Sequence, residues 1–255
     1  MTKLLIIKEK KKEIDGKERT VIKPKQYLIE DLNKDFETQY GTIKKEDLQK
    51  EGIVRSSTGK EFILMETKFI DLFKRLRKLP QTMSLKDLGI ITAETGINKD
   101  SVVVDAGTGS GHAACYLANI CKQVNTYEIK EENIEISKKN AERLSLRNIN
   151  FHKADIHEGI KEKDVDLILL DLPNPVNVID NAIRSLKTGG FIVVYSLCLQ
   201  PLEEFIREVR KRKELLYIKT LETIERLWKI EGKITRPKNT EIGHTGFLTF
   251  VRKIL

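Results

Sequence analysis

Long apolar runs and cysteine are both scarce in this chain of 255 residues. No apolar stretch approaches the ~20 residues that a membrane-spanning helix needs, and no signal-peptide pattern opens the chain. The three cysteines, Cys115, Cys121 and Cys198, lack the spacing of metal ligands. We therefore expect a cytoplasmic protein with reduced, packed thiols, without a metal site and without contact to a membrane.

Charged residues, by contrast, make up 33% of the chain, and the formal net charge is +8. An excess of positive charge suits a polyanionic partner such as nucleic acid. A surface rich in ion pairs, which organisms growing at high temperature favour, gives the same composition. Composition alone leaves both interpretations open.

Alternating strand and helix patterns after Ser101 predict an α/β domain with an open, doubly wound sheet that binds ligands at the carboxyl ends of its strands. Two long strands, 216–227 and 245–251, are expected to close it as an antiparallel pair. Many short strands separated by turns predict a small β-module over residues 1–65. The Rossmann-like domain then spans 66–255, with leading helices within 66–100. The expected helices are 67–78, 85–95, 113–121, 131–144 and 176–186, and the expected parallel strands are 102–104, 124–128, 149–152, 165–171 and 191–195.

A glycine-rich turn follows the apolar run Val102–Val104, which is typical of a buried parallel strand. Glycines in such a turn let the backbone bend sharply and approach a ligand closely. The dinucleotide motif G-x-G-x-x-G is not met, because His112 occupies the position of its third glycine. The pattern D-x-G-x-G-x-G after a strand instead resembles the first motif of the S-adenosylmethionine-dependent methyltransferases. Its residues are Asp105, Gly107, Thr108, Gly109, Ser110 and Gly111.

Four acidic residues stand at the ends of four consecutive predicted strands: Asp105, Glu128, Asp155 and Asp171. One such residue is usually a helix cap, but four at one edge of a sheet predict a binding crevice. Glu128 is placed to accept hydrogen bonds from both ribose hydroxyls of a nucleoside, and Asp155 from the adenine amino group. Asp105 is expected either to hold the glycine turn or to meet an ammonium group. Asn133 either reaches the nucleoside or is an exposed helix residue.

Prolines on both sides of Asn174 make a rigid, extended turn directly after Asp171. Methyltransferases that attack amino groups carry an aromatic residue at the end of a related motif. That aromatic is missing here, which disfavours an exocyclic amine of DNA as the acceptor. The motif reads Asp171-Leu172-Pro173-Asn174-Pro175.

Taken together, the glycine turn, Tyr127-Glu128, Ala154-Asp155 and the Asp-Leu-Pro-Asn-Pro turn resemble the TrmI-type tRNA adenine-N1 methyltransferases. The resemblance extends to both ends of the chain, through Tyr40-Gly41-Thr42-Ile43, Gly52-Ile53-Val54-Arg55-Ser56-Ser57 and Gly243-His244-Thr245-Gly246-Phe247. One departure is clear. The family's Gln-x-Ile-Tyr-Pro-Lys-Asp reads Gln81-Thr82-Met83-Ser84-Leu85-Lys86-Asp87, so an aromatic contact is lost or is supplied elsewhere, for example by Tyr195.

The resemblance implies a class I methyltransferase with a seven-stranded, mostly parallel sheet, S-adenosylmethionine as cofactor, tRNA as substrate and a homotetrameric assembly. Members modify the T-loop adenine 58 and, in archaea, also adenine 57. We predict Asp171 and Tyr195 as catalytic residues. The predicted cofactor contacts are Gln81, Asp105, Gly107, Thr108, Gly109, Ser110, Gly111, Glu128, Asn133, Asp155 and Asp171. The predicted tRNA contacts are Arg75, Arg77, Lys78, Arg236, Lys238 and His244.

The expected reaction needs no general base, because N1 of neutral adenine carries a lone pair that attacks the sulfonium methyl in line. Positive charge then develops on the purine, and the Asp171 carboxylate, accepting from the amino group, stabilises it. Because N1 lies on the pairing edge, the base must be unpaired or flipped out. Two alternatives stay open. A silent tRNA-binding subunit is disfavoured by the intact turn with Glu128 and Asp171, and a methyltransferase for another acceptor is disfavoured by the terminal motifs.

Overall fold

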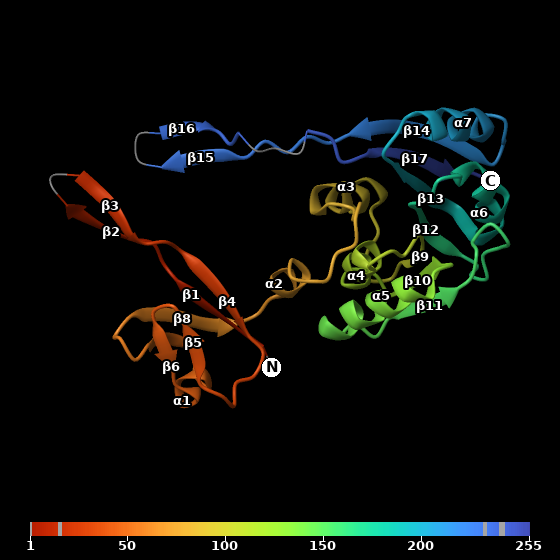
Figure 1. Ribbon diagram of the computed structural model, residues 1–255. Helices are drawn as coiled ribbons and strands as arrows, with labels where there is room; N and C mark the ends of the chain where they lie inside the picture. The colour runs from red at the N-terminus through yellow and green to blue at the C-terminus, as the bar shows by residue number, and fades with distance from the viewer. Residues whose placement is uncertain (1, 15–16, 232–233, 240–242) are drawn as a thin grey trace. The chain divides into compact units, whose positions relative to one another are not determined.

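The structure is a computed structural model that describes residues 2–14, 17–231, 234–239 and 243–255. The chain forms two compact units, Met1–Arg75 and Leu76–Leu255 (Figure 1). None of the helices among the described residues is long and apolar enough to cross a membrane. Each unit is built around its own sheet, and the glycine-rich turn and the proline-rich turn lie in the second.

The first unit is a small β-module around a four-stranded antiparallel sheet with the strand order β4-β1-β8-β7. Side chains such as Leu5, Phe62 and Leu64 form its buried core. This confirms the predicted β-module. Its strands are β1 (Lys3–Ile7), β2 (Lys10–Ile14), β3 (Lys17–Ile22), β4 (Lys25–Ile29), β5 (Phe36–Thr38), β6 (Gly41–Ile43), β7 (Gly52–Arg55) and β8 (Glu61–Glu66), and its helices are α1 (Lys45–Leu48) and α2 (Phe69–Phe73).

One short stretch of this module differs from the prediction. Of the polar residues 8–12, expected in a turn, residues 10–12 instead belong to β2, which pairs with β3 in a two-stranded ribbon. Main-chain pairing between two strands does not require apolar side chains, so the lysines do not prevent it. The predicted turn residues Asp15 and Gly16 lie outside the described part of the chain.

The second unit contains a seven-stranded sheet with the order β11-β10-β9-β12-β13-β17-β14. Neighbours from β11 to β13 are parallel, whereas β17 runs antiparallel between β13 and β14. This confirms the predicted Rossmann-like fold and its closing antiparallel pair. The strands are β9 (Val102–Ala106), β10 (Gln123–Glu128), β11 (Ile149–Lys153), β12 (Val165–Leu170), β13 (Leu186–Ser196), β14 (Leu215–Glu222) and β17 (Phe247–Lys253).

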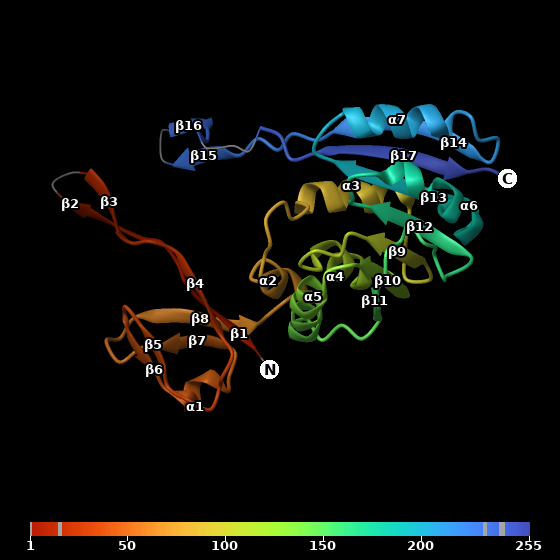
Figure 2. The ribbon, with the colours of Figure 1, turned by 45° about the vertical axis from the view of Figure 1, so that its right-hand side comes forward.

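Helices cover both faces of this sheet, which explains the unbroken apolar sequence of its central strand. All four residues from Leu167 to Leu170 in β12 are 0% exposed, although their side chains alternate between the two faces. Figure 2 shows α3, α4 and α5 against one side and α6 and α7 against the other. The helices are α3 (Leu85–Thr95), α4 (His112–Ala118), α5 (Glu131–Arg143), the 3-10 helix η1 (Pro175–Val178), α6 (Ile179–Ser185) and α7 (Gln200–Val209).

The helix predicted over 67–78 ends early, since α2 covers only Phe69–Phe73. Both main-chain groups of Arg77 bond to the side chain of Asn140 instead of continuing the helix. The helix predicted over 176–186 begins as η1, and the glycines at 189 and 190 belong to β13 rather than closing a helix. A Cβ on Gly190 would lie 2.9 Å from the Val165 carbonyl oxygen, so glycine permits close pairing there.

The strand predicted over 216–227 is shorter than expected. β14 ends at Glu222, opposite Phe247, the first residue of its partner β17. Beyond that point the chain leaves the sheet and forms a hairpin of β15 (Trp228–Glu231) and β16 (Ile234–Pro237), which stands away from the sheet (Figure 1). We call residues 223–245 the hairpin excursion, because the chain departs from the sheet and returns to it within this segment.

Candidate active site

A pocket of about 490 Å³ opens at the carboxyl ends of β9 and β12, where the strand order of the sheet reverses. This switch point is where open α/β sheets bind their ligands. Its walls come from the loop before α3, the glycine turn, the start of α5 and the end of β12. The lining residues include Gln81, Gly107, Thr108, Gly109, Ser110, Glu128, Asn133 and Asp171, eight of the predicted site residues.

The glycine turn is pressed directly against the end of β12. Gly107 has a φ of +89°, and a Cβ on it would lie 2.0 Å from the main-chain oxygen of Asp171. The Asp171 amide donates to the Ala106 carbonyl at 2.9 Å, which fixes the two strand ends side by side. Only glycine at 107 combines this φ with this approach, so the sequence signal and the geometry agree.

Glu128 organises the opposite wall through hydrogen bonds to both of its carboxylate oxygens. Oε1 accepts from the amides of Ile129 and Lys130 at 2.9 and 3.0 Å, and Oε2 accepts from the Gly109 amide and from Asn133 Nδ2, both at 3.1 Å. The carboxylate thus ties the glycine turn to the start of α5. The sequence left Asn133 either as a nucleoside contact or as an exposed helix residue. In the structure it lines the pocket and donates to Glu128.

Two carboxyl groups at the carboxyl ends of β9 and β12 have raised pKa values. Burial raises the pKa of Asp171 to about 7, and the nearby Asp105 adds to the shift. Burial also raises the pKa of Asp105 to about 6. A hydrogen bond from Thr126 lowers this pKa, and the negative charge of Glu128 raises it. Thr126 Oγ1 donates to Asp105 Oδ2 at 2.7 Å, whereas the buried Oδ1 has no hydrogen-bond partner among the described residues. A cationic ligand in this pocket would relieve the repulsion between these carboxylates.

Comparison with known proteins decides the family. A methyltransferase domain family matches residues 97–241. The tRNA (adenine(57)-N(1)/adenine(58)-N(1))-methyltransferase TrmI of Methanocaldococcus jannaschii is 35% identical over 260 residues, covering 89% of this chain and 91% of that protein. The chain belongs to the TrmI family of methyltransferases.

Solved structures share this fold over the full chain. A S-adenosylmethionine-dependent O-methyltransferase from Thermotoga maritima superposes with a TM-score of 0.80 at 25% identity, covering 100% of this chain and 93% of that one. The TrmI of Aquifex aeolicus gives a TM-score of 0.76 at 19% identity, with coverages of 100% and 97%. The predicted class I methyltransferase fold is thereby confirmed.

Other predicted site residues of this TrmI-family chain lie outside the pocket lining. Gly111 is the left-handed residue before α4, with φ +77°. Asp155 accepts from the His157 amide at 2.9 Å and contacts its Nδ1 at 2.6 Å, and the other ring nitrogen lies 3.2 Å from the Asn174 carbonyl oxygen. His157, which the sequence did not single out, therefore links Asp155 to the proline-rich turn.

None of the predicted tRNA contacts is among the pocket-lining residues. Arg77, Lys78, Arg236 and Lys238 are exposed, and Arg236 bonds to Asn239 Oδ1 at 2.6 Å. Arg75 lies in the first unit, where its guanidinium donates to the Asp71 carbonyl. Gln81 lines the pocket with a φ of +63°, a conformation that is uncommon for a residue other than glycine.

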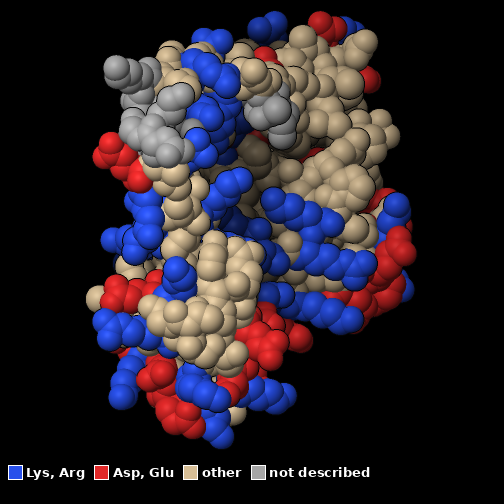
Figure 3. Space-filling view, turned by 60° about the vertical axis from the view of Figure 1, so that its left-hand side comes forward, with Lys and Arg blue, Asp and Glu red and all other residues tan. Residues whose placement is uncertain are grey.

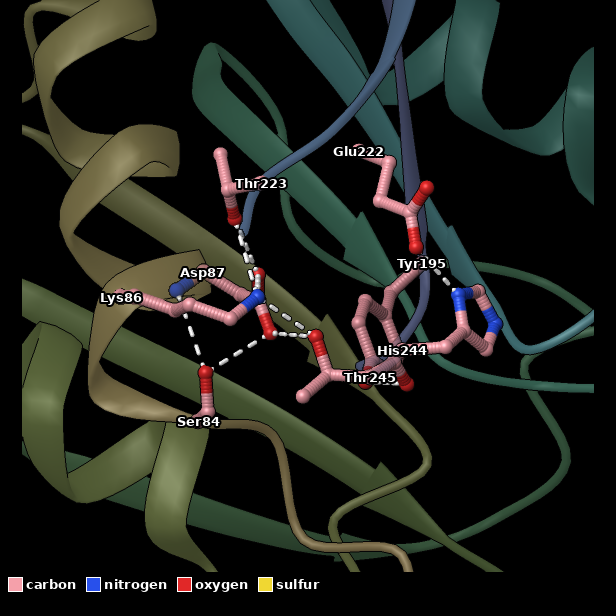
Figure 4. Close-up of polar contacts among 8 residues, drawn as sticks. All are labelled: Ser84, Lys86, Asp87, Tyr195, Glu222, Thr223, His244 and Thr245. Carbon is pink, nitrogen blue, oxygen red and sulfur yellow. Dashed lines mark hydrogen bonds and ion pairs between the residues drawn. The ribbon is translucent and has the colours of Figure 1, made fainter. Parts of the chain in front are cut away.

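Tyr195, Ser84 and His244 meet on a second cluster at the ends of β13, β14 and β17 (Figure 4). Ser84, which replaces the family's tyrosine, caps α3 by accepting from the Asp87 amide. Tyr195 is 4% exposed and donates to the Thr245 carbonyl at 2.5 Å. The sequence analysis quoted Asp87 only as the last residue of the motif that begins at Gln81 and did not predict it as a site residue, because its partners lie far away along the chain.

The raised pKa of Asp171 predicts a change in stability with pH. Between its ordinary value of 3.8 and about 7 the unfolded chain ionises this group and the folded protein does not, so wild-type stability falls as pH rises through that window. Asp171→Asn cannot ionise, and we expect a higher Tm than wild type above about pH 7, with the difference vanishing near pH 4. Thermal unfolding across this range measures it, with the exposed Asp100→Asn as control. Equal Tm values above pH 7 would contradict the raised pKa.

Proposed function

We propose that this protein transfers a methyl group from S-adenosylmethionine to N1 of T-loop adenine 58, and of adenine 57, in tRNA. The observation that carries the proposal is the extent of the identity to a protein named as this enzyme, which spans 89% of the chain and so includes both units. Acceptors differ widely among methyltransferases that share the fold, so a match over the catalytic domain alone would not support an acceptor.

The pocket suits S-adenosylmethionine in size and in charge. A volume of about 490 Å³ lies within the ordinary range of small-molecule sites. The positively charged sulfur and ammonium of this cofactor match the carboxyl groups of Asp105 and Asp171, and the orphaned Asp105 Oδ1 suits the ammonium. Glu128 would hold the ribose, with ribose hydroxyls taking over from the donors now on Oε2. Asp155 as the adenine contact stays a prediction.

We assign Asp171 to the acceptor side of the pocket, and its place among the pocket-lining residues supports this assignment. S-adenosylmethionine supplies an electrophilic methyl group, and adenine N1 supplies the electron pair of the new bond. As the purine becomes positive its amino group becomes a stronger donor, and ionised Asp171 accepts from it. The hydrogen bond strengthens as charge moves, so it lowers the barrier rather than merely binding the base. The predicted catalytic role of Tyr195 also stays a prediction.

The tRNA has to present an unpaired adenine, and its phosphates require positive charge on the enzyme. Figure 3 shows many exposed Lys and Arg side chains, with Asp and Glu side chains among them. We extend the proposal to a cytoplasmic enzyme that assembles as a homotetramer, as the family resemblance implies. Light scattering of the purified protein tests that assembly directly.

Two exposed cations, Arg236 in β16 and Lys238 directly after it, give a prediction about tRNA affinity. In the double variant Arg236→Ala/Lys238→Ala we expect the slope of log affinity against log salt to fall by about 2, one for each lost phosphate contact. The KM for tRNA should rise and kcat should stay unchanged, because neither side chain lies near the pocket. Filter binding over a salt series measures the slope. Lys99→Ala, an exposed lysine of α3's following loop, is the control, and an unchanged slope in the double variant would remove these residues from the interface.

One experiment separates this function from its alternatives. Purified protein with labelled S-adenosylmethionine is offered a T-arm RNA hairpin and, separately, a peptide containing an isoaspartyl carboxylate. We expect label in the RNA only. Label in the peptide would favour an O-methyltransferase, which the Thermotoga maritima superposition raises. Tight cofactor binding without transfer to either acceptor would favour a silent subunit.

A further inference from the structure

Asp87 is a buried charge that is not among the pocket-lining residues, and its carboxylate is fully hydrogen-bonded. It is 0% exposed, and its two oxygens accept four hydrogen bonds (Figure 4). Four is about the full capacity of a carboxylate. The donors are Lys86 Nζ at 2.7 Å and Thr223 Oγ1 at 2.8 Å on Oδ1, and Ser84 Oγ at 2.8 Å and Thr245 Oγ1 at 2.9 Å on Oδ2.

These donors come from three parts of the chain. Ser84 and Lys86 belong to the start of α3, Thr223 directly follows β14, and Thr245 lies two residues before β17. Thr223 and Thr245 are therefore the two ends of the hairpin excursion. Lys86 also contacts both threonine hydroxyls, at 3.0 and 2.6 Å, so the ammonium and the carboxylate hold the same two residues.

A second pair closes the base of the excursion beside Asp87. His244 Nδ1 lies 2.5 Å from Glu222 Oε1, and its Nε2 lies 3.0 Å from the Leu197 carbonyl oxygen. Both partners are acceptors, so both ring nitrogens donate, and Glu222 raises the pKa of His244. His244, three residues before β17, thus connects Glu222 at the end of β14 with Leu197 directly after β13. The tRNA contact predicted for His244 from the sequence stays a prediction.

The excursion reaches the active site through Tyr195. The Tyr195 hydroxyl donates to the Thr245 carbonyl, and its ring lies so close to Gly246 that a Cβ there would be 2.5 Å from it. Burial raises the pKa of Tyr195 to about 12, with contributions from the charges of Asp87 and Asp171. Leu170 of β12 pairs with Val194 of β13, so Asp171 and Tyr195 are the next residues along two neighbouring strands. The orientation of Tyr195 depends on where Thr245 is held.

A buried ion pair of this kind is rarely retained for stability, since well-packed apolar residues serve as well or better. Fixing one arrangement among several is the better-attested role of such a group. We propose that Asp87 is a positioning residue for methyl transfer: it fixes both ends of the hairpin excursion and, through Thr245, the placement of Tyr195 beside Asp171. The proposal rests on the proposed function.

The test removes one hydroxyl, which donates to Asp87 and accepts from Lys86, without changing the shape of the site. Thr245→Val deletes the hydroxyl that donates to Asp87 and keeps the carbonyl that holds Tyr195, whereas Thr245→Ser keeps both. Displacement of a reacting group by a fraction of an ångström typically lowers kcat by roughly 10- to 100-fold. We expect that loss in kcat for a tRNA transcript with Thr245→Val, an unchanged Kd for S-adenosylmethionine, and kcat near wild type with Thr245→Ser.

Thr249→Val is the matched control, because Thr249 is also buried in β17 and loses one hydroxyl contact, to Thr220. It should lower Tm comparably and leave kcat unchanged. Tyr195→Phe completes a double-mutant cycle with Thr245→Val. If Thr245 acts through Tyr195, the second substitution should add less than about twofold to the first.

Several results would overturn the inference. A wild-type kcat in Thr245→Val, or equal losses of kcat in Thr245→Val and Thr245→Ser, would show that the hydroxyl is not needed. Additive losses in the double-mutant cycle would show that Thr245 does not act through Tyr195. An equal loss of kcat in Thr249→Val would show that any buried hydroxyl has the same effect. A wild-type protein that methylates no tRNA would overturn the proposed function and this inference together. An active wild type with any of the preceding results overturns the inference alone.

Discussion

Asp171→Asn is expected to lower kcat for tRNA methylation by roughly 10²–10³-fold, the usual effect of losing one group that stabilises developing charge. The amide of Asn retains an acceptor oxygen and nearly the same shape, but it loses the negative charge that strengthens as the purine becomes positive. Binding of S-adenosylmethionine should change far less, because the glycine turn and Glu128 remain. Single-turnover methyl transfer and equilibrium cofactor binding measure the two effects separately. A variant with wild-type kcat would remove Asp171 from the chemistry.

The pH profile provides the control for that interpretation. Because burial and Asp105 raise the pKa of Asp171 to about 7, wild-type kcat/KM should fall about tenfold per pH unit below that value. The residual activity of Asp171→Asn should not show this fall in kcat/KM at low pH. Asp100→Asn, an exposed change of the same kind, should keep both the rate and the fall at low pH.

Gly107→Ala is expected to weaken S-adenosylmethionine binding by on the order of 10²-fold, through strain of a few kcal/mol at the switch point. The added Cβ would sit 2.0 Å from the main-chain oxygen of Asp171, and main chain cannot rotate aside as a side chain can. Either β9 and β12 separate at their carboxyl ends or the turn is displaced into the pocket. Isothermal titration of the cofactor measures the loss.

Gly96→Ala is the control that separates the steric overlap with the Asp171 main chain from the backbone strain of a left-handed alanine. Gly96 has a φ of +65°, also in the left-handed region, but a Cβ there meets nothing within 4 Å. That variant should lose some stability and bind the cofactor normally. Comparable losses of affinity in both variants would show that the close approach at Gly107 is not what matters.

The parts of the site that the sequence predicted are those whose signals are local. An apolar strand, an acidic residue and three glycines stand within ten residues, and the sheet order then brings Asp171 to Gly107 by a general rule of the fold. The same rule explains why Glu128 reaches the pocket. Asp155 also stands at a strand end but is not among the pocket-lining residues, and its contact to adenine stays a prediction.

The cluster around Asp87 was beyond such reasoning for a physical reason. Its threonine partners are 136 and 158 residues away along the chain, and a threonine at the end of a strand carries no pattern of its own. His244 was predicted as a tRNA contact, which stays a prediction, and only the structure reveals its contacts to Glu222 and Leu197. The early end of α2 was not predicted for the same reason. The main chain of Arg77 bonds to Asn140, which is 63 residues away along the chain.

The central claim is that the acceptor atom is N1 of a T-loop adenine. The most direct measurement is methylation of an unmodified tRNA transcript by the purified protein, followed by nuclease digestion and mass spectrometry of the nucleosides and of the T-arm fragment. We predict 1-methyladenosine within the T loop, lost with Asp171→Asn. A methyl group on another atom or outside the T loop, or no transfer despite tight cofactor binding, would contradict the account.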